Sequence, residues 1–441
     1  MRVLITNLFV NNFGGSENVV ELLADGLRRA DHQPIVYAPV LGPQAEKMRT
    51  RGIRVVDRIG HVADKPDIIH GQHLTPCLTA MARFPDVPVV FASHSSVLEI
   101  EVPLEHPQIR EVVAVDESCA ARCRQRGVPV ERLSVILNAV DLERFRRRAA
   151  LPAQPKKALL LTKNAGHRAI VRTACAAAGL ELDELGPGTG NFIPNIESVL
   201  GNYDIVFATA RMALEAATTG CAVVVCDERG FAGMLTARDL AAWRAMNFGV
   251  GLLAHPVTPE RVQAAIAQYD AADSAAVTDE LRRSAGSEGY VQSHLEVYRR
   301  AIQRPAPSAE EIALATAYWV EELAVTTAHR KWTSVAREFG MGSSFLGLEE
   351  PPPVSAAVAA LEAKVAELKR SLEVAQAEQA GFWSTSLDNV NANVSASLDS
   401  VNSNIAGLGA RLDAMQKAKF ALLRRLKQAL IPRSLRTKYL S

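Results

Sequence analysis

The fold is decided by residues 203 to 227, YDIVFATARMALEAATTGCAVVVCD. The apolar runs DIVFA and CAVVVCD predict two short strands that are buried on both faces, and the segment between them predicts one helix that stops at Gly220. Two buried strands joined by a helix form a parallel pair with a right-handed crossover. Because open sheets of this kind hold ligands at the carboxyl ends of their strands, we expect ligand contacts just after each strand.

Residues 1 to 150 show the same alternation of strands and helices. The strand-like runs are VLIT, PIVYA, IRVV, DIIH, VPVVFAS, VVAV and LSVIL, and helical segments lie between most of them. This order predicts a doubly wound parallel sheet. A polar linker, RRRAALPAQPKK, then leads to the run ALLLT, so residues 151 to 285 are expected to form a second domain of the same kind. The predicted fold class is α/β, with two Rossmann-like domains followed by an α-helical extension that contains a coiled coil.

The composition excludes several classes of protein. The 441 residues carry a net charge of +1, which gives no general attraction to nucleic acid, and no apolar run is long enough to span a bilayer. The opening MRVLIT is interrupted too soon by NNFGG to be a signal peptide, so a cytoplasmic protein is expected. The six cysteines form no CxxC motif and have no histidines at zinc-site spacing, which predicts reduced thiols and no metal.

The acidic residue of the opening stretch is Glu215, in LEAATTG. By position alone it is an acid in the first turn of a helix, where the helix dipole favours it. The segment also resembles the donor-binding segment of retaining GT-B glycosyltransferases, in which LEA-M-A-x-G precedes a similar strand. The resemblance implies that Glu215 is a catalytic-site residue that binds the ribose hydroxyls of a nucleotide sugar. In that family a glutamate eight residues earlier contacts the sugar, and this chain has Phe207 there.

After the first predicted strand, Gly14 and Gly15 lead into a helix in the sequence GGSE. Glycines let the backbone approach a ligand closely, and the amino end of a helix presents unpaired N–H groups to phosphate or hydroxyl oxygens. Taken alone, this is a loop and a helix start, because the GxGxxG motif is absent. GG-x-E resembles the amino-terminal loop of family-four glycosyltransferases, which implies that Gly14, Gly15 and Glu17 face the acceptor and the donor phosphates.

Three histidines follow predicted strands: His70 and His73 in DIIHGQH, and His94 in VVFASHSS. At a strand end a histidine can donate a hydrogen bond to a phosphate or a sugar hydroxyl. Each can also be a structural histidine with satisfied hydrogen bonds, which is our expectation for His70 and His73. Family four has a cleft histidine that matches His94, so the resemblance implies a catalytic role for His94.

The passage between the two predicted domains carries the most specific likeness. VPVERLSVILNAVDLERF resembles the family-four run V-x-x-E-R-(I/V)-x-V-(I/L)-x-N-(G/A)-V-D-x-x-x-F, which marks entry into the second domain. Asn138 and Asp141 suit a turn for local reasons, because both side chains accept hydrogen bonds from backbone N–H groups. We interpret them as structural residues.

Basic residues follow the run ALLLT. A diphosphate leaving group needs positive charge nearby, because negative charge builds on the departing oxygen. In the resembled family a basic pair serves this purpose, with arginine first, and here Lys163 comes before Arg168. Arg211, in the turn before Glu215, is a third candidate for the diphosphate. Lys163 and Arg168 can also be solvated surface residues. The glycine-rich and proline-rich segment ELGPGTGNFIPN predicts a loop near the nucleotide base, without the lysine of a P-loop.

The rest of the chain is predicted to be helical. Residues 286 to 302 have an apolar face, and in GT-B proteins a late helix crosses back to the first domain, so Tyr290 and His294 are expected to pack at that interface. Residues 303 to 350 predict a helical extension. Valine and leucine alternate at four-and-three spacing in residues 354 to 379, which predicts a parallel two-stranded coiled coil, a homo-oligomer and a stalk over residues 351 to 415. Residues 416 to 441 are basic and amphipathic, which favours contact with an anionic membrane surface; a helix docked on a partner or a solvated tail is the alternative.

The resemblance covers residues 1 to 302 and implies a retaining glycosyltransferase that requires no metal. It would use a nucleoside diphosphate sugar as co-substrate and a saccharide or lipid-linked acceptor, as in surface glycan synthesis. Two alternatives stay open. One is a sugar-nucleotide epimerase of the GT-B fold, and the other is a non-catalytic scaffold, which Phe207 and the long tail favour.

Overall fold

The computed structural model describes residues 1–11, 15–191, 193 and 195–338. Its first sheet has seven strands, all parallel, in the order β5-β3-β1-β6-β7-β8-β9. These strands are β1 (Arg2–Thr6), β3 (Gln33–Tyr37), β5 (Arg54–Val56), β6 (Ile68–Gly71), β7 (Val89–Ser93), β8 (Ile109–Ala114) and β9 (Leu133–Val135). Every strand-like run predicted for residues 1 to 150 is one of them, so the parallel α/β class is confirmed here.

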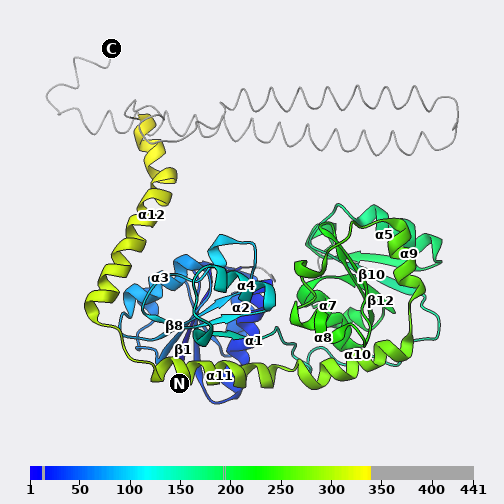
Figure 1. The fold of residues 1–441 in the computed structure, drawn as a ribbon, viewed down its shortest axis with the longest axis horizontal. Coiled ribbons are helices and arrows are strands. Elements are labelled where there is room, and N and C mark those ends of the chain that lie inside the picture. Colours follow the sequence, from blue (N-terminus) through cyan, green and yellow to red (C-terminus); the bar gives the residue numbers. More distant parts are fainter. Residues whose placement is uncertain (12–14, 192, 194, 339–441) are drawn as a thin grey trace, which may run out of the picture. The chain divides into compact units, whose positions relative to one another are not determined.

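Helices cover both faces of this sheet. One core holds Ile5 of β1 together with Leu23 and Tyr298, and the other holds Leu4 together with Met81. Because successive residues of a strand point to opposite faces, Leu4 and Ile5 enter different cores, and a strand buried in this way is apolar throughout. The covering helices are α1 (Gly15–Arg29), α2 (Pro43–Thr50), α3 (Leu74–Arg83), α4 (Glu117–Gln125) and α11 (Ser287–Gln303), and a small pair, β2 (Phe9–Val10) and β4 (Val40–Leu41), lies beside them. Figure 1 labels β1 and β8 of this sheet, with α1, α2, α3, α4 and α11 around it.

The second sheet has five strands in the order β11-β10-β12-β13-β14. Four are parallel, and β14 is an antiparallel edge strand, formed by a segment for which the sequence suggested no role. The strands are β10 (Lys157–Leu161), β11 (Glu181–Leu185), β12 (Ile205–Ala208), β13 (Ala222–Asp227) and β14 (Gly230–Met234). The helices are α5 (Arg168–Ala177), α6 (Glu197–Leu200), α7 (Ala210–Thr219), α8 (Leu240–Ala245), α9 (Pro259–Ala267) and α10 (Ala271–Ser284).

The opening stretch of the sequence analysis forms β12, α7 and β13. The strands pair in parallel with Phe207 beside Val224, and Gly220 ends α7 with a left-handed φ of +104°. Its N–H donates to the carbonyls of Ala216 and Ala217. These bonds satisfy carbonyls at the helix end that would otherwise lack a partner, so the predicted strand, helix, glycine stop and strand are confirmed.

Two features join the first and second sheets. Helix α11 follows the second sheet in the chain but packs on the first, where Arg110 of β8 donates to the carbonyl of Ala301 at 3.3 Å. The second feature is Asn247 of the second domain, whose side chain accepts a hydrogen bond from the N–H of Asn138 at 3.2 Å and donates one to the carbonyl of Val115. The turn residue Asn138 therefore lies at a contact that spans the linker between the two sheets.

The described chain ends in helix α12 (Ala309–Glu338). Its first turns contact the first domain, where Thr316 hydrogen-bonds the ring of His106 at 3.1 Å. Among the described residues, no helix is long and apolar enough to cross a membrane. The predicted stalk over residues 351 to 415, the homo-oligomer through residues 354 to 379, the basic tail over residues 416 to 441 and the loop residue Gly14 lie outside the described residues.

Candidate functional site

The amino end of α7 has a strained backbone. Ala210 begins the helix with a φ of +52°, a value that residues other than glycine rarely adopt. Its N–H donates to the carbonyl of Phe248 at 2.7 Å, and Asn247 and Phe248 also have positive φ values, +47° and +52°. Conformations of this kind cost free energy and gather at functional sites. The strained segment sets the position of Arg211, one helical turn before Glu215.

Arg211 and Glu215 form a buried ion pair. Arg211 Nε donates to Glu215 Oε1 at 2.7 Å, and the two side chains are only 13% and 7% exposed. The Nη1 group of Arg211 is buried and has no hydrogen-bond partner among the described residues. A buried donor without a partner is costly, so this guanidinium has capacity for an anion.

Lys163 follows β10 and reaches toward the first domain. A Cβ atom placed on Gly15, at the start of α1, would lie 3.4 Å from Lys163 Nζ. Glu17 of α1 and Glu215 of α7 both act on its charge, so the ammonium lies between the two helices. Lys163 as a residue is exposed, yet the surroundings of its ammonium end lower the pKa of Lys163 by desolvation, with Arg229 and Arg211 adding to the effect and Glu17 and Glu215 opposing it. Lys163 makes no hydrogen bond or close ion pair within the described part of the chain.

Arg168, the second predicted diphosphate residue, is placed elsewhere. Its Nε donates to Glu184 Oε2 of β11 at 2.6 Å, and Arg172 binds the other oxygen of the same carboxylate at 2.6 Å. The carboxylate of Glu184 holds Arg168 at the start of α5, and Lys163 has Arg211 and Arg229 as its basic neighbours instead. The structure therefore brings Lys163 and Arg211 together but leaves Arg168 out of that group.

His94 lies at the end of β7 and is half-buried. No described residue hydrogen-bonds to its ring, and its Nε2 atom is buried without a partner. Burial lowers the pKa of His94, and the nearby carboxylate of Glu101 opposes that effect. The ring thus has unused hydrogen-bonding capacity at the carboxyl end of the first sheet, where ligands of open sheets bind.

The two other predicted histidines are bonded within the protein, as expected for structural histidines. His70 contacts the Tyr298 hydroxyl at 2.9 Å and the side-chain amide of Gln72 at 3.2 Å. His73 contacts Glu101 at 3.0 Å. Burial holds the pKa of His70 well below its usual range, and the neighbouring rings of His294 and His94 act in the same direction.

The position eight residues before Glu215 supplies no polar group. Phe207 is fully buried in the core between the second sheet and helices α5 and α9. The side chain therefore packs against its neighbours and lies away from Glu215. No group of histidine, cysteine, aspartate or glutamate residues in the described ranges is arranged to hold a metal ion.

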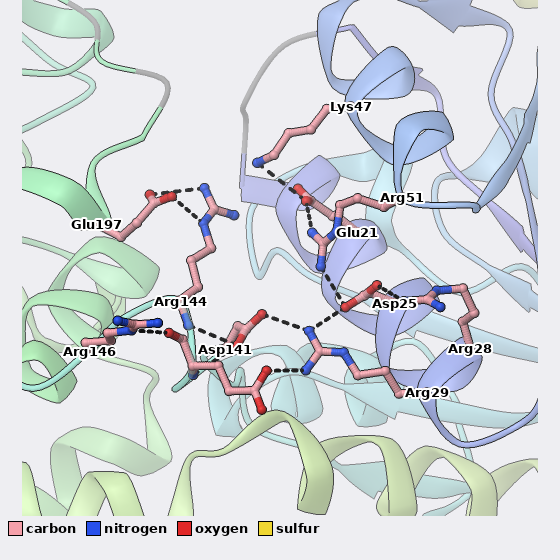
Figure 2. Close-up of polar contacts among 11 residues, drawn as sticks. Glu21, Asp25, Arg28, Arg29, Lys47, Arg51, Asp141, Arg144, Arg146 and Glu197 are labelled. Atoms are coloured by element: carbon pink, nitrogen blue, oxygen red, sulfur yellow. Dashed lines mark hydrogen bonds and ion pairs between the residues drawn. The ribbon is translucent and has the colours of Figure 1, made fainter.

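One residue near this site was missed from the sequence, although it belongs to the quoted VDLERF motif. Arg144 binds Glu197 of α6 with two hydrogen bonds, at 2.6 and 3.1 Å (Figure 2). Burial acts to lower the pKa of Arg144, but Glu197, Glu21 and Glu215 raise it above the usual range. Arg144 therefore stays charged beside three acids, one of which is Glu215.

Figure 2 shows a second set of charges on the buried side of α1. Asp25 binds Arg51 at 2.7 Å and Arg29 at 2.6 Å, and Arg29 also binds Asp141 of the VDLERF motif at 3.2 Å. Burial acts to raise the pKa of Asp25, but these arginines hold it below the usual range. Ion pairs thus connect the amino-terminal helix that carries Gly15 and Glu17 to the VDLERF motif that carries Arg144.

Comparisons with known proteins find a family match for the first domain and a similar fold among solved structures. Residues 13–144 match the family model described as Glycosyltransferase Family 4. The Anabaena protein HepE, crystallised with UDP and glucose, matches with a TM-score of 0.53 and 14% sequence identity, covering 68% of this chain and 99% of HepE. HepE with UDP-glucose matches with a TM-score of 0.50 and 14% identity, covering 68% and 99%. The curated proteins include no match to this sequence. At this level of identity the likeness to HepE concerns the fold.

Proposed function

We propose that this chain, which has the GT-B fold, is a family-four-like glycosyltransferase that transfers a sugar from a nucleoside diphosphate sugar to a saccharide or lipid-linked acceptor. One observation carries the proposal. Lys163 lies near Glu215 and the amino end of α1 without a close ion pair among the described residues, and the Nη1 group of Arg211, whose Nε is paired with Glu215, has no hydrogen-bond partner there. A diphosphate supplies negative oxygens for the Lys163 ammonium and for the Arg211 Nη1 group.

Each residue then has a role in the transfer. Lys163 and Arg211 bind the diphosphate and stabilise the negative charge that builds on it as the sugar leaves. Glu215, held by Arg211, accepts hydrogen bonds from the ribose hydroxyls. Gly15 leaves room for the phosphates at the start of α1, and His94 faces the sugar and the acceptor. With two cations beside the leaving group, the reaction requires no metal, and the family resemblance favours retention at the anomeric carbon.

Phe207 changes how the sugar is held. In the resembled family a glutamate at this position contacts the sugar, and a buried phenylalanine cannot replace its hydrogen bonds. The sugar contacts therefore come from other groups, with His94 the first candidate from the first domain. The printed ligands of HepE, UDP and glucose, make UDP-sugars the first donors to test.

The activity is tested by measuring nucleoside diphosphate released when the full chain is incubated with UDP-glucose, UDP-galactose, UDP-N-acetylglucosamine or GDP-mannose. We expect release from at least one donor and its near loss in Lys163→Met. Arg172→Gln is the matched control, because it removes an exposed basic residue that pairs with Glu184 and lies apart from Lys163. Equal rates in the two variants would contradict the proposed role of Lys163.

The burial of Phe207 favours a second candidate, a non-catalytic scaffold of the same fold. A scaffold releases no nucleoside diphosphate from any donor, with or without a membrane extract as a source of acceptor.

Two further proposals concern the end of the chain, for a cytoplasmic enzyme that works on surface glycans. We propose a membrane contact through residues 416 to 441 and a homo-oligomer through residues 354 to 379. Co-sedimentation of the full chain with anionic vesicles tests the first, and light scattering tests the second.

A further inference from the structure

A buried histidine and glutamate connect three loops at the carboxyl end of the first sheet. The side chains of His73 and Glu101 are 6% and 5% exposed. His73 Nδ1 accepts from the N–H of Leu8 at 3.0 Å. In a neutral ring the proton then lies on Nε2, which donates to Glu101 Oε1 at 3.0 Å. The second oxygen of Glu101 accepts from the N–H of His94 at 3.1 Å.

The connected loops follow β1, β6 and β7, which are three successive strands of the first sheet. Glu101 closes the loop after β7 by binding the backbone of His94, seven residues back along the chain. Burial acts to raise the pKa of Glu101, but the bonds from His73 and the nearby His94 hold it below the usual range. The carboxylate is therefore ionised and directed at the residue that starts the loop.

The backbone of His73 shows that its side chain matters. His73 has a φ of +56° and a ψ of 139°, a conformation outside the left-handed helical region that is strained for every residue except glycine. Histidine occupies a position where the backbone conformation alone favours glycine, and both ring nitrogens of His73 form hydrogen bonds. The two hydrogen bonds offset the strain.

We propose that His73 and Glu101 are positioning residues for His94, through which Glu101 fixes the backbone of His94 and sets the electrostatic environment of its ring. The imidazole is faced by Glu101 of its own loop, by His73 before α3, by His70 of β6 and by His294 of α11. Glu101 is the carboxylate in that set. The inference rests on the proposed function only in taking His94 as the group that faces the sugar and acceptor.

Glu101→Gln is the first test of this inference. The amide has the size of the carboxylate but one acceptor oxygen and no charge, so it cannot accept from His73 and His94 together. Loss of a carboxylate at this distance is expected to lower the pKa of His94 by about one pH unit. The acid limb of the rate of nucleoside diphosphate release moves in the same direction, because His94 stays neutral to a lower pH.

A matched pair at His73 separates positioning from simple structural support. In His73→Gln the amide nitrogen can still donate to Glu101, whereas His73→Asn is too short to do so but can accept from the N–H of Leu8. At the φ and ψ of His73 both asparagine and glutamine carry the strain of a Cβ atom. Backbone strain alone therefore makes the two changes equal, and positioning of His94 makes His73→Gln the milder one.

The measurement is a titration by NMR of the full chain labelled with ¹³C-histidine, with the His94 signal assigned from His94→Gln. We expect the pKa of His94 to fall in Glu101→Gln and His73→Asn and to stay near the wild-type value in His73→Gln. An unchanged pKa of His94 in Glu101→Gln, or equal or reversed effects of His73→Asn and His73→Gln on that pKa, overturns the inference. The titration needs no substrate, so a wild-type chain that releases no nucleoside diphosphate contradicts the proposed function and leaves this test standing.

Discussion

At the scale of single residues, Ala210 shows how the backbone prepares the site. Its positive φ orients the first turn of α7, from which Arg211 and Glu215 project. Glycine adopts this φ without the strain of a Cβ, so Ala210→Gly relieves about 1–2 kcal/mol of strain against an entropic cost of about 0.5–1 kcal/mol. We expect thermal unfolding to show a small increase in stability. Ala213→Gly, in the buried interior of the same helix, is the control and should lower stability by about 1 kcal/mol or more. Equal losses in both variants would contradict the strain at Ala210.

The charge of Lys163 predicts a pH dependence of nucleotide binding. Burial lowers the pKa of Lys163 in the free protein, whereas a bound diphosphate favours the protonated form. UDP therefore binds most tightly at pH values below the pKa of Lys163 in the unliganded protein, and its affinity falls as the pH rises through that pKa. Because this pKa is lowered, the fall begins at a lower pH than for an ordinary lysine. Lys163→Arg stays charged at all these pH values, so the loss of affinity should disappear. Calorimetric titrations of both proteins with UDP between about pH 7 and 9.5 measure the difference, and parallel curves would exclude Lys163 from the site.

At the scale of elements, the charges on α1 stabilise the fold through Asp25. The carboxylate is buried and binds Arg51 and Arg29, which are partly exposed, so Asp25→Asn is expected to lower the free energy of unfolding by about 2 kcal/mol at pH 7. Because the pKa of Asp25 is lowered in the folded state, this contribution is present above the unfolded-state pKa and is lost as the pH falls through the folded-state value. The difference in unfolding free energy between the wild-type chain and Asp25→Asn, measured by urea unfolding, should thus stay constant down to about pH 4 and decrease below it.

A surface pair on α2 provides the control for Asp25. Glu46 binds Arg49 with both side chains exposed, so Glu46→Gln is expected to change stability by less than about 0.5 kcal/mol. If Asp25→Asn costs no more than this surface change, the buried network in Figure 2 contributes little to the fold.

At the scale of the whole molecule, the sequence predicts the sheets better than the site. Runs such as VLIT and DIIH became β1 and β6 because a parallel strand buried on both faces is apolar throughout, and Gly220 ends α7 for a local reason. Glu101 could not be found in this way. Its role depends on His73, 28 residues earlier in the chain, and a single sequence has no signal that pairs two polar residues across a fold.

The predicted site residues show the same difference between local sequence signals and contacts made across the fold. Lys163 and Arg211 were predicted from strand and helix ends, which topology brings together. Arg168 met the same rule, but its position is decided by Glu184 on the neighbouring strand, a competition that spacing does not reveal. The positive φ of Ala210 accompanies a hydrogen bond to Phe248. That residue also lies far along the chain from Ala210, so the local sequence does not reveal the contact.

The central claim is that Lys163 and Arg211 together bind the diphosphate of a nucleotide sugar. The most direct measurement is calorimetric titration of the wild-type chain, Lys163→Met and Arg211→Met with UDP and with uridine, which lacks the diphosphate. The account predicts that the wild-type chain binds UDP at least about 100-fold more tightly than uridine, as two charge-assisted contacts of about 1.5–3 kcal/mol each require. Each variant should lose at least about tenfold in affinity for UDP, and Lys163→Met should leave uridine binding unchanged. Equal affinities for UDP and uridine in the wild-type chain, or UDP binding that neither substitution weakens, would contradict it.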